Sequence, residues 1–287
     1  MIKKEKQYTI GTDIGGTKMN AVLFDGKRVV ADYQLATPKD TLDHFMVMLK
    51  ALLEPLEEKA RENKTRIKGI GVGVAGVIDY EKNIMLNSPN ISIINGVKLV
   101  EELEKITDLP IKLDNDANCF IRAESLIGAG KGYNNNYGFI IGTGIGGGWW
   151  INGEVYRGSH GGAGEPGEMI IDYQEEVGLE EAYHKLTQNN PAQLAEETYR
   201  GDVLGQKAFE EVGQYFGIAF ANIVNLIDPE IFIIGGGVVE ASDLFLAQSK
   251  KIMIKHIDSE ESAKKIKVIK GKLGANAGAI GAAMLIT

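Results

Sequence analysis

Two glycine-rich turns in this sequence have the residue types that hold phosphate groups. The first is Asp13-Ile-Gly-Gly-Thr-Lys18, and the second runs from Gly142 to Gly148. Glycine lets the backbone approach a phosphate closely and point N–H groups at it, since no Cβ stands in the way. Thr17 adds a hydroxyl donor, and Lys18 offers either a positive charge or an ordinary solvated side chain. The alternative for the first turn is a simple tight hairpin, in which Gly-Gly is common.

The second turn matches the dinucleotide-binding pattern G-x-G-x-x-G over Gly142–Gly147. That pattern indicates a Rossmann site only where it opens a helix. Here it runs into Gly148-Trp-Trp-Ile-Asn-Gly153, which has the character of a strand and a turn, and no Walker sequence G-x-x-x-x-G-K-[ST] occurs. The residues therefore favour a second hairpin phosphate loop similar to the first.

A pair of such loops suits phosphoryl transfer. Loops on two facing domains can hold the β- and γ-phosphates of a nucleotide from both sides, while a metal neutralises charge and an acceptor hydroxyl is aligned. Asp13 cannot bind a phosphate directly, but it can act through Mg²⁺, an ion that takes oxygen ligands and keeps several waters. The sequence thus predicts ATP and Mg²⁺ as ligands, with Asp13 contacting the metal through water.

The elements that must position the loops alternate between strands and helices in two similar halves. Each half opens with a β-meander around its glycine turn and then adds strands and helices. The predicted strands are Tyr8–Ile14, Asn20–Phe24, Arg28–Leu35, Ile67–Ala75, Ile111–Asp114, Tyr137–Gly142, Gly147–Ile151, Glu154–Tyr156, Glu230–Ile234 and Ile266–Lys270. The predicted helices are Thr41–Asn63, Val97–Thr107, Asn118–Leu126, Leu179–Leu186, Pro191–Tyr199, Asp202–Ile227, Ser242–His256 and Ala275–Leu285. This duplicated α/β pattern predicts two related domains facing each other across a cleft.

The bulk composition excludes several other classes of protein. A net charge of −8 over 287 residues argues against a nucleic-acid-binding surface, which normally shows a basic excess. No apolar stretch reaches the ~18 residues of a membrane span, and no apolar signal region follows Met1–Gln7. The single cysteine, Cys119, cannot form an internal disulfide and is expected to be a buried side chain in a reducing compartment. We therefore expect a cytoplasmic protein that binds neither nucleic acid nor membrane.

Taken together and in order, the motifs of this chain resemble those of the ROK sugar kinases and repressors, within the actin-like, hexokinase-like ATPase superfamily. The matching segments are Asp13–Lys18, Gly73–Asp79, Asn87-Ser-Pro89, Asp114–Asn118, Gly142–Gly148, Gly162–Met169, Gly235–Gly237 and Leu273–Ala283. The resemblance implies an α/β fold of two actin-like (ribonuclease H-like) domains, with mixed β-sheets flanked by helices. The implied domains are 1–116, with a returning C-terminal helix at 276–287, and 117–275.

The resemblance also implies roles for individual residues. Asp116, in the Asn-Asp-Ala motif, corresponds to the catalytic base, and a carboxylate that accepts a proton helps a sugar hydroxyl to attack phosphorus. Without the resemblance, Asn115 and Asp116 are equally interpretable as caps of the following helix. The implied sugar ligands are Gly76, Asn87, Asn115, Asp116 and Glu165. The implied ATP-binding residues are Asp13, Gly15, Gly16, Thr17, Lys18, Thr143, Gly144, Gly236, Gly237 and Asn276.

The chain departs from the family pattern beside Glu165. Family members typically have a zinc-binding His three residues later, where this chain has Glu168, and three Cys in the stretch that corresponds to Ile171–Glu180. Since that stretch has no Cys, we expect no zinc site. Glu168 is expected either to replace the His as a sugar ligand or to stabilise its loop. Glu180 fits the family's Leu-Glu pair and is expected to reach the sugar, with a solvated residue at a helix start as the alternative.

These observations predict an ATP-dependent hexose kinase that makes glucose 6-phosphate, and by the resemblance a homodimer. The alternative acceptors are N-acetylmannosamine, another amino sugar, fructose or a β-glucoside. Repressors of the family carry a winged helix-turn-helix domain before the first loop, whereas only 12 residues precede Asp13 here and the charge is acidic. A non-catalytic sugar-sensing protein is a third possibility, which the presence of Asp13, Thr17, Asp116 and Glu165 opposes.

Overall fold

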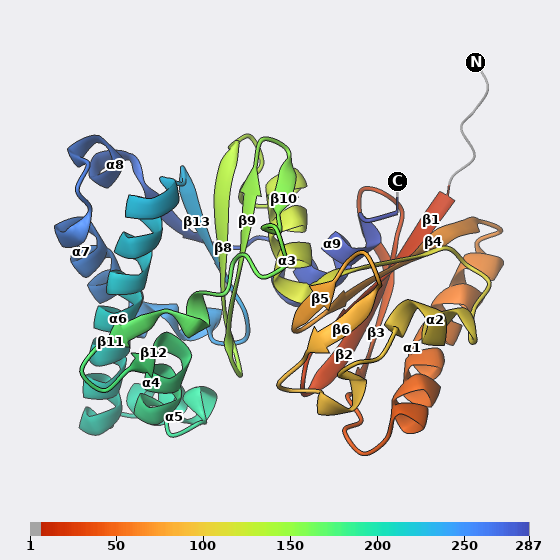
Figure 1. Cartoon of the computed structure of the whole chain (residues 1–287), viewed down its shortest axis with the longest axis horizontal. Coiled ribbons are helices and arrows are strands. Elements are labelled where there is room, and N and C mark those ends of the chain that lie inside the picture. Colours follow the sequence, from red (N-terminus) through yellow and green to blue (C-terminus); the bar gives the residue numbers. More distant parts are fainter. Residues whose placement is uncertain (1–6, 287) are drawn as a thin grey trace. The chain divides into compact units, whose positions relative to one another are not determined.

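The computed structural model describes residues 7–286, and its chain divides into two compact units (Figure 1). The first unit contains the chain up to Leu126, the segment Arg157–Ala163 and the C-terminal segment from Leu273. The second unit contains Ile127–Tyr156 and Gly164–Lys272. The predicted absence of a signal region concerns the N-terminal segment, of which residues 1–6 lie outside the described residues, as does residue 287.

Each unit is built on one five-stranded sheet, and the two sheets have the same topology. Their strand orders are β3-β2-β1-β4-β7 and β10-β9-β8-β13-β14. In each, three antiparallel strands form a meander, and two further strands lie parallel to its first strand. The strands of the first sheet are β1 (Gln7–Ile14), β2 (Lys18–Phe24), β3 (Val29–Ala36), β4 (Arg66–Val74) and β7 (Ile111–Asn115). Those of the second are β8 (Asn135–Ile141), β9 (Ile145–Ile151), β10 (Glu154–Tyr156), β13 (Ile231–Gly235) and β14 (Lys267–Lys270).

Helices cover these sheets, which confirms the predicted fold class of two α/β units with mixed sheets. The first unit has α1 (Leu42–Glu62), α2 (Leu99–Glu104), α3 (Asp116–Leu126) and α9 (Ala277–Ala283). The second has α4 (Leu179–Leu186), α5 (Pro191–Tyr199), α6 (Val203–Ile227), α7 (Leu246–His256) and α8 (Glu260–Lys265). Short 3-10 helices are Ser92–Ile94, Pro166–Glu168, Val239–Leu244 and Gly274–Asn276. Within residues 7–286, no helix combines the length and apolarity needed to cross a bilayer.

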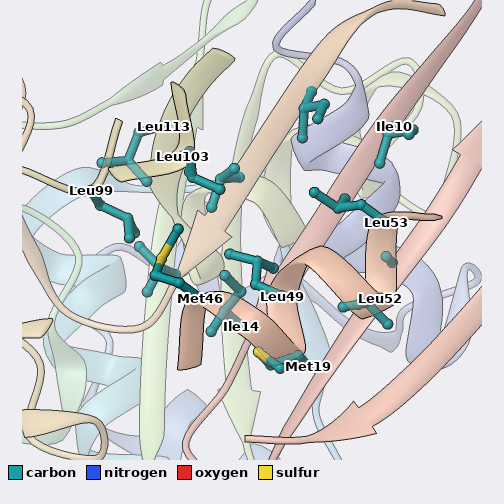
Figure 2. Packing of buried hydrophobic residues seen from close by; sticks show 14 of the residues in the cluster. Ile10, Ile14, Met19, Met46, Leu49, Leu52, Leu53, Leu99, Leu103 and Leu113 are labelled. Atoms are coloured by element: carbon teal, nitrogen blue, oxygen red, sulfur yellow. The ribbon is translucent and has the colours of Figure 1, made fainter. Parts of the chain in front are cut away.

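The apolar stripe of α1 forms much of the core of the first unit. Its N-cap is Thr41, whose Oγ1 accepts a hydrogen bond from the backbone N–H of His44 at 3.2 Å. Leu49 and Leu52 of α1 are fully buried with Ile14 and Met19 of the sheet, as Figure 2 shows. Burying such side chains stabilises the fold by about 1.5–3 kcal/mol each. The glycine turn therefore connects two strands, β1 and β2, whose side chains are well packed in the core.

The small-residue helix α9 packs almost directly on the backbone of the first sheet. A Cβ at Gly11 of β1 or Gly71 of β4 would overlap the carbonyl oxygens of Ala279 and Ala282, respectively. On the other side of α9, a Cβ at Gly281 would overlap the carbonyl of Cys119, which is buried on α3. This spacing explains the Ala and Gly content of the C-terminal segment, and it brings the first turn of α9 to the end of β1.

An aromatic cluster forms the core of the second unit. Phe139 of β8 contacts Phe216 and Phe220 of α6 edge to face, with ring centroids 5.6 and 4.9 Å apart. Phe220 in turn lies 4.9 Å from Phe232 of β13. Such pairs contribute about 0.5–1.5 kcal/mol beyond the area they bury. This core holds the ends of β8 and β13 together, which is where the second glycine turn begins.

The structure corrects several element boundaries. The single helix predicted over Ser242–His256 is divided, because the backbone at Phe245 leaves the helical conformation between Val239–Leu244 and α7. The segment predicted as one helix from Ala275 to Leu285 likewise begins with a 3-10 turn before α9. Helix α2 is shorter than the predicted Val97–Thr107, and α3 starts at Asp116 rather than at Asn118.

Two short hairpins and one helix went unpredicted. They are β5–β6 (Val77–Asp79 and Ile84–Asn87), β11–β12 (Ile170–Asp172 and Val177–Gly178) and α8. Strands of two to four residues are too short for an alternation of apolar and polar residues to show. The predicted boundary at residue 116 assigns α3 to the second domain, whereas in the structure α3 packs on α9 and belongs to the first unit.

Candidate functional site

Three parallel strands of the first unit end at one edge of the sheet, and the predicted catalytic residues lie there. Asp13 pairs with Gly73 across β1 and β4, and Gly73 pairs with Asp114 across β4 and β7. Asn115 and Asp116 follow directly at the start of α3. In open α/β sheets, ligands bind outside the carboxyl ends of the strands. The fold therefore brings Asp13 together with Asn115 and Asp116, about 100 positions apart in the sequence.

Asp13 and Asp116 influence each other's ionisation. Burial raises the pKa of Asp13 to about 7, the negative charge of Asp116 raises it further, and the positive charge of Lys18 opposes the rise. Burial also raises the pKa of Asp116, to about 6, although hydrogen bonds from the backbone N–H groups of Ala117 and of Asp116 itself act in the opposite direction. A carboxylate of this kind is poised to exchange a proton close to neutral pH.

The capping role that the sequence left open falls to Asn115. Its Oδ1 accepts a hydrogen bond from the backbone N–H of Asn118 at 3.1 Å, and its Nδ2 donates to the carbonyl of Gly76 at 3.0 Å. Asp116 is the first residue of α3, and its Oδ1 accepts from the N–H of Ala117 at 2.9 Å. Asn115 therefore stabilises the helix start and the neighbouring loop, while Asp116 is held at the edge of the sheet.

Gly76 and Asn87, both predicted sugar ligands, meet beside Asn115. Gly76 has φ of 127°, and a Cβ there would overlap the carbonyl oxygen of Asn87. Asn87 itself is exposed at the end of β6, paired with Val77. The structure thus gathers Gly76, Asn87, Asn115 and Asp116 into one polar corner of the first unit.

The donor set at this edge fits a magnesium ion. Burial and the negative charge of Asp116 both raise the pKa of Asp13, so a cation beside the two carboxylates would favour their ionised forms. Mg²⁺ is typically held by one or two carboxylates, with waters and substrate phosphates as its other ligands. The Asp13 carboxylate also lies against Gly278 in the first turn of α9, where a Cβ would overlap it. Because Gly278 has no side chain, the Asp13 carboxylate can occupy this space.

The first glycine turn is braced by β3 and a nearby loop. The Gly15 N–H donates to the Lys18 carbonyl at 3.1 Å, and Thr37 donates its hydroxyl to the Gly15 carbonyl at 2.7 Å. Gly16 packs against Asn90, whose Cβ would lie 2.5 Å from a Cβ at that position. The Thr17 and Lys18 side chains remain exposed. The turn is thus rigid in its backbone and open at its side chains, as a phosphate contact requires.

Asn276, a predicted ATP ligand, belongs to the first unit. Its Oδ1 accepts a hydrogen bond from Asn20 Nδ2 at 2.7 Å, just before α9 begins. The bond ties the entry of α9 to β2, next to the strand that carries Asp13.

A buried ionic network lies under Asn115 and Asp116, and sequence reasoning missed it. The Asp114 carboxylate is fully buried and accepts hydrogen bonds from Arg122 Nη2 at 2.8 Å and from Arg157 Nη2 at 2.5 Å. The Tyr80 hydroxyl donates to it at 2.8 Å, and Asn118 Nδ2 does so at 3.1 Å. Burial alone would raise the pKa of Asp114, but the hydrogen bond and charge of Arg157 and the charge of Arg122 hold it below its usual value.

In the second unit, two glycine turns meet at the equivalent edge of the sheet. The loop after β8 contains Thr143 and Gly144, and its Gly142 N–H donates to the Gly144 carbonyl at 2.9 Å. The loop after β13 contains Gly236, with φ of 93°, where a Cβ would overlap the backbone of Ile141. A Cβ at Gly142 would lie 3.9 Å from the Gly237 N–H nitrogen. The predicted nucleotide-binding residues of this unit are therefore brought together.

The three predicted sugar-contacting glutamates lie near this second turn, in different settings. Glu165 and Glu168 are exposed at the two ends of the 3-10 stretch around Pro166. Burial, and to a smaller extent the negative charge of Glu165, raises the pKa of Tyr137. Glu180 is partly buried: its carboxylate accepts a hydrogen bond from the Ile145 N–H and lies against Gly144. Glu180 thus contacts the loop between β8 and β9, which its position in the sequence did not indicate.

The stretch that corresponds to the family's zinc segment forms the β11–β12 hairpin. Ile170 pairs with Gly178, and the exposed tip contains Tyr173. Among residues 7–286, no group of three or more His, Cys, Asp or Glu side chains is arranged to hold a metal ion. The expectation that this chain needs no zinc stays a prediction.

The comparisons with known proteins agree with this arrangement. The profile of the ROK family matches residues 9–287. The N-acetylgalactosamine kinase AgaK of Shewanella sp. (strain ANA-3) is 29% identical over 265 residues, covering 83% of this chain and 84% of that protein. The xylose repressor of Caldicellulosiruptor bescii is 26% identical over 285 residues, covering 88% of this chain and 71% of that protein.

The solved structures include a near relative of the same architecture. The ROK family glucokinase from Streptomyces griseus, in complex with glucose and AMPPNP, superimposes with a TM-score of 0.83 at 27% identity, covering 97% of this chain and 99% of that one. These relatives include both sugar kinases and repressors. Since the family profile spans nearly the whole sequence, the resemblance seen in the motifs is confirmed, and the chain belongs to the ROK family.

Proposed function

We propose that this chain is an ATP-dependent hexose kinase that transfers the γ-phosphoryl group of ATP to a sugar hydroxyl. The observation that carries the proposal is the pair of partly buried carboxylates, Asp13 and Asp116, at the carboxyl edge of three parallel strands. A protein that only senses a sugar has no need of two carboxylates whose burial makes them costly to ionise. A kinase needs one to accept a proton and one to interact with a metal.

In the proposed reaction, Asp116 accepts the proton of the attacking sugar hydroxyl. Its pKa of about 6 leaves it ionised at neutral pH, yet basic enough to take the proton as the new P–O bond forms. Asn115 and Gly76 hold the start of α3 in place, which orients Asp116. Mg²⁺, when bound beside Asp13 with the phosphates of ATP, would neutralise the charge that develops on the transferred group.

The remaining predicted ligands complete this proposal. Sugar contacts are assigned to Gly76, Asn87 and Asn115 of the first unit and to Glu165, Glu168 and Glu180 of the second. Phosphate and nucleotide contacts are assigned to Gly15, Gly16, Thr17, Lys18, Thr143, Gly144, Gly236, Gly237 and Asn276. The homodimer and the cytoplasmic location expected from the sequence belong to the same proposal.

Glucose is the proposed acceptor, and the alternatives are N-acetylmannosamine, another amino sugar, fructose or a β-glucoside. The similar glucokinase structure contains glucose, while the relative from Shewanella acts on N-acetylgalactosamine according to its name. The exposed position of Glu168 leaves its carboxylate available to a sugar substituent.

The proposal is tested by coupled ADP release over a panel of hexoses, amino sugars and β-glucosides, with ATP and Mg²⁺. We expect turnover with at least one hexose and the greatest kcat/KM for glucose. Sugar-independent ADP release, measured in parallel, is the control. Sugar binding by calorimetry without turnover on any acceptor would point instead to a sugar-sensing protein, the role carried by repressors of this family.

A second prediction concerns pH. If Asp116 must be ionised to accept a proton, kcat/KM should rise with pH through about 6 and level off above about 7, where Asp13 is ionised as well. Below this range the carboxyl groups are protonated, and activity should fall about tenfold per pH unit for each carboxylate that must be ionised. The profile is measured as initial rates between pH 5 and 8.5. Enzyme incubated at each pH is then assayed again at pH 8, which excludes irreversible denaturation as the cause of lost activity. A flat profile would contradict the assignment of Asp116 as the base.

A further inference from the structure

We propose that His184 is a positioning residue for the second phosphate loop, acting with Glu180 to aim the Gly144 N–H at a phosphate of the nucleotide. The inference rests on the proposed kinase function. It adds a residue that neither the glycine pattern nor the family motifs indicate, because His184 lies some 40 positions away on α4.

Helix α4 contacts the loop at two points. His184 Nε2 lies 2.6 Å from the carbonyl oxygen of Thr143, and Glu180 Oε2 accepts the N–H of Ile145. A carbonyl oxygen can only accept, so His184 must carry its proton on Nε2 and donate it. Residues four apart on a helix lie on the same face. The two side chains therefore hold the loop on either side of Gly144.

This pair of bonds determines the direction of the Gly144 N–H. The carbonyl of Thr143 and the N–H of Gly144 belong to one planar trans peptide, in which the two groups point in opposite directions. Since His184 holds the carbonyl toward α4, the N–H of Gly144 points away from α4. Glycine is needed at position 144 on the side that faces α4, because a Cβ there would lie only 2.7 Å from Glu180 Oε2.

The helix that carries the pair is firmly anchored. Leu179 and Tyr183 of α4 are buried, and the Tyr183 ring lies 5.7 Å from that of Phe216 in the aromatic core. A donor on a packed helix holds its partner more accurately than one on a loop. His184 is itself only partly buried and lies 5.9 Å, ring to ring, from Tyr183. Its hydrogen bond thus serves the loop rather than the core.

Two substitutions distinguish the effect of losing the hydrogen-bond donor of His184 from the effect of changing its side-chain volume. His184→Gln keeps an N–H donor at nearly the position of Nε2, whereas His184→Leu keeps the volume and removes the donor. The matched control is His256→Leu, since His256 occupies the last turn of α7 in the same unit and is exposed. Binding of Mg²⁺ and a non-hydrolysable ATP analogue is measured by calorimetry, and KM for ATP and for the sugar by steady-state kinetics.

We expect His184→Leu to weaken binding of the analogue and to raise KM for ATP about tenfold, which corresponds to the loss of one hydrogen bond. KM for the sugar should change less than about twofold, because no sugar contact is removed. His184→Gln should recover most of the loss, and His256→Leu should behave as the wild type.

The possible outcomes test the role of His184 separately from the proposed kinase function. If the wild type binds no nucleotide, the kinase proposal fails. If the wild type binds and His184→Leu binds equally well, only the role of His184 is overturned. Equal losses in the Leu and Gln variants, accompanied by a lower melting temperature, would show that His184 supports the fold rather than donating to the loop.

Discussion

Replacing Asp116 with Asn is expected to lower kcat by about 10³-fold, within the range that general-base catalysis supplies. The amide has nearly the same shape as the carboxylate, but it cannot accept a proton from the sugar hydroxyl. The hydrogen bond from the Ala117 N–H can persist, since the amide retains an acceptor oxygen. The dissociation constant of the sugar, measured by calorimetry in the absence of ATP, should therefore change by less than about threefold.

The matched control for this prediction is Asp32→Asn. Asp32 is exposed on β3 and lies in the same unit, so the substitution removes one charge without touching the carboxyl edge of the sheet. Its kcat should equal that of the wild type. A variant at Asp116 that retains more than about a tenth of wild-type kcat would exclude this carboxylate as the base.

Replacing Asp114 with Asn is expected to lower the free energy of unfolding by about 3–5 kcal/mol, the usual cost of removing one partner from a buried ion pair. The amide leaves Arg122 and Arg157 facing each other without the buried negative charge that now pairs with both. Urea denaturation followed by fluorescence measures the change. Asp79→Asn is the control, because Asp79 pairs with Lys82 at the surface and its loss should hardly move the midpoint.

The same network predicts a dependence of stability on acid. The pKa of Asp114 is lower in the folded chain than in the unfolded chain, where it is about 4. The ionised Asp114 carboxylate therefore contributes its full stabilisation only at pH values above about 4. That effect is lost as pH falls through the folded value. The Asn variant should lack this component, so its urea midpoint should approach that of the wild type in acid. If the urea midpoints of the wild type and the Asn variant differ by the same amount at pH 3 and at pH 7, the charge of the Asp114 carboxylate does not stabilise the fold.

Local sequence patterns were sufficient for most long elements of the fold. The apolar positions of α1 recur at helical spacing, and the helix predicted from Thr41 begins at Leu42 with Thr41 as its N-cap. The two glycine turns were correctly assigned between strands. The short hairpins β5–β6 and β11–β12 could not be predicted, because pairing of a few residues depends on what packs beside them.

By itself, the sequence determined the class of fold, the duplicated meander and the family, because glycine turns and apolar periods are local properties of the chain. It also singled out Asp13 and Asp116 as candidate groups. Only the tertiary structure decided that these two carboxylates share one environment, that Asp114 pairs with Arg157, and that His184 holds the Thr143 carbonyl. Each of these contacts joins residues some 40 to 100 positions apart. Such pairs are set by strand order and helix packing, and no local pattern along the chain encodes which side chains will meet.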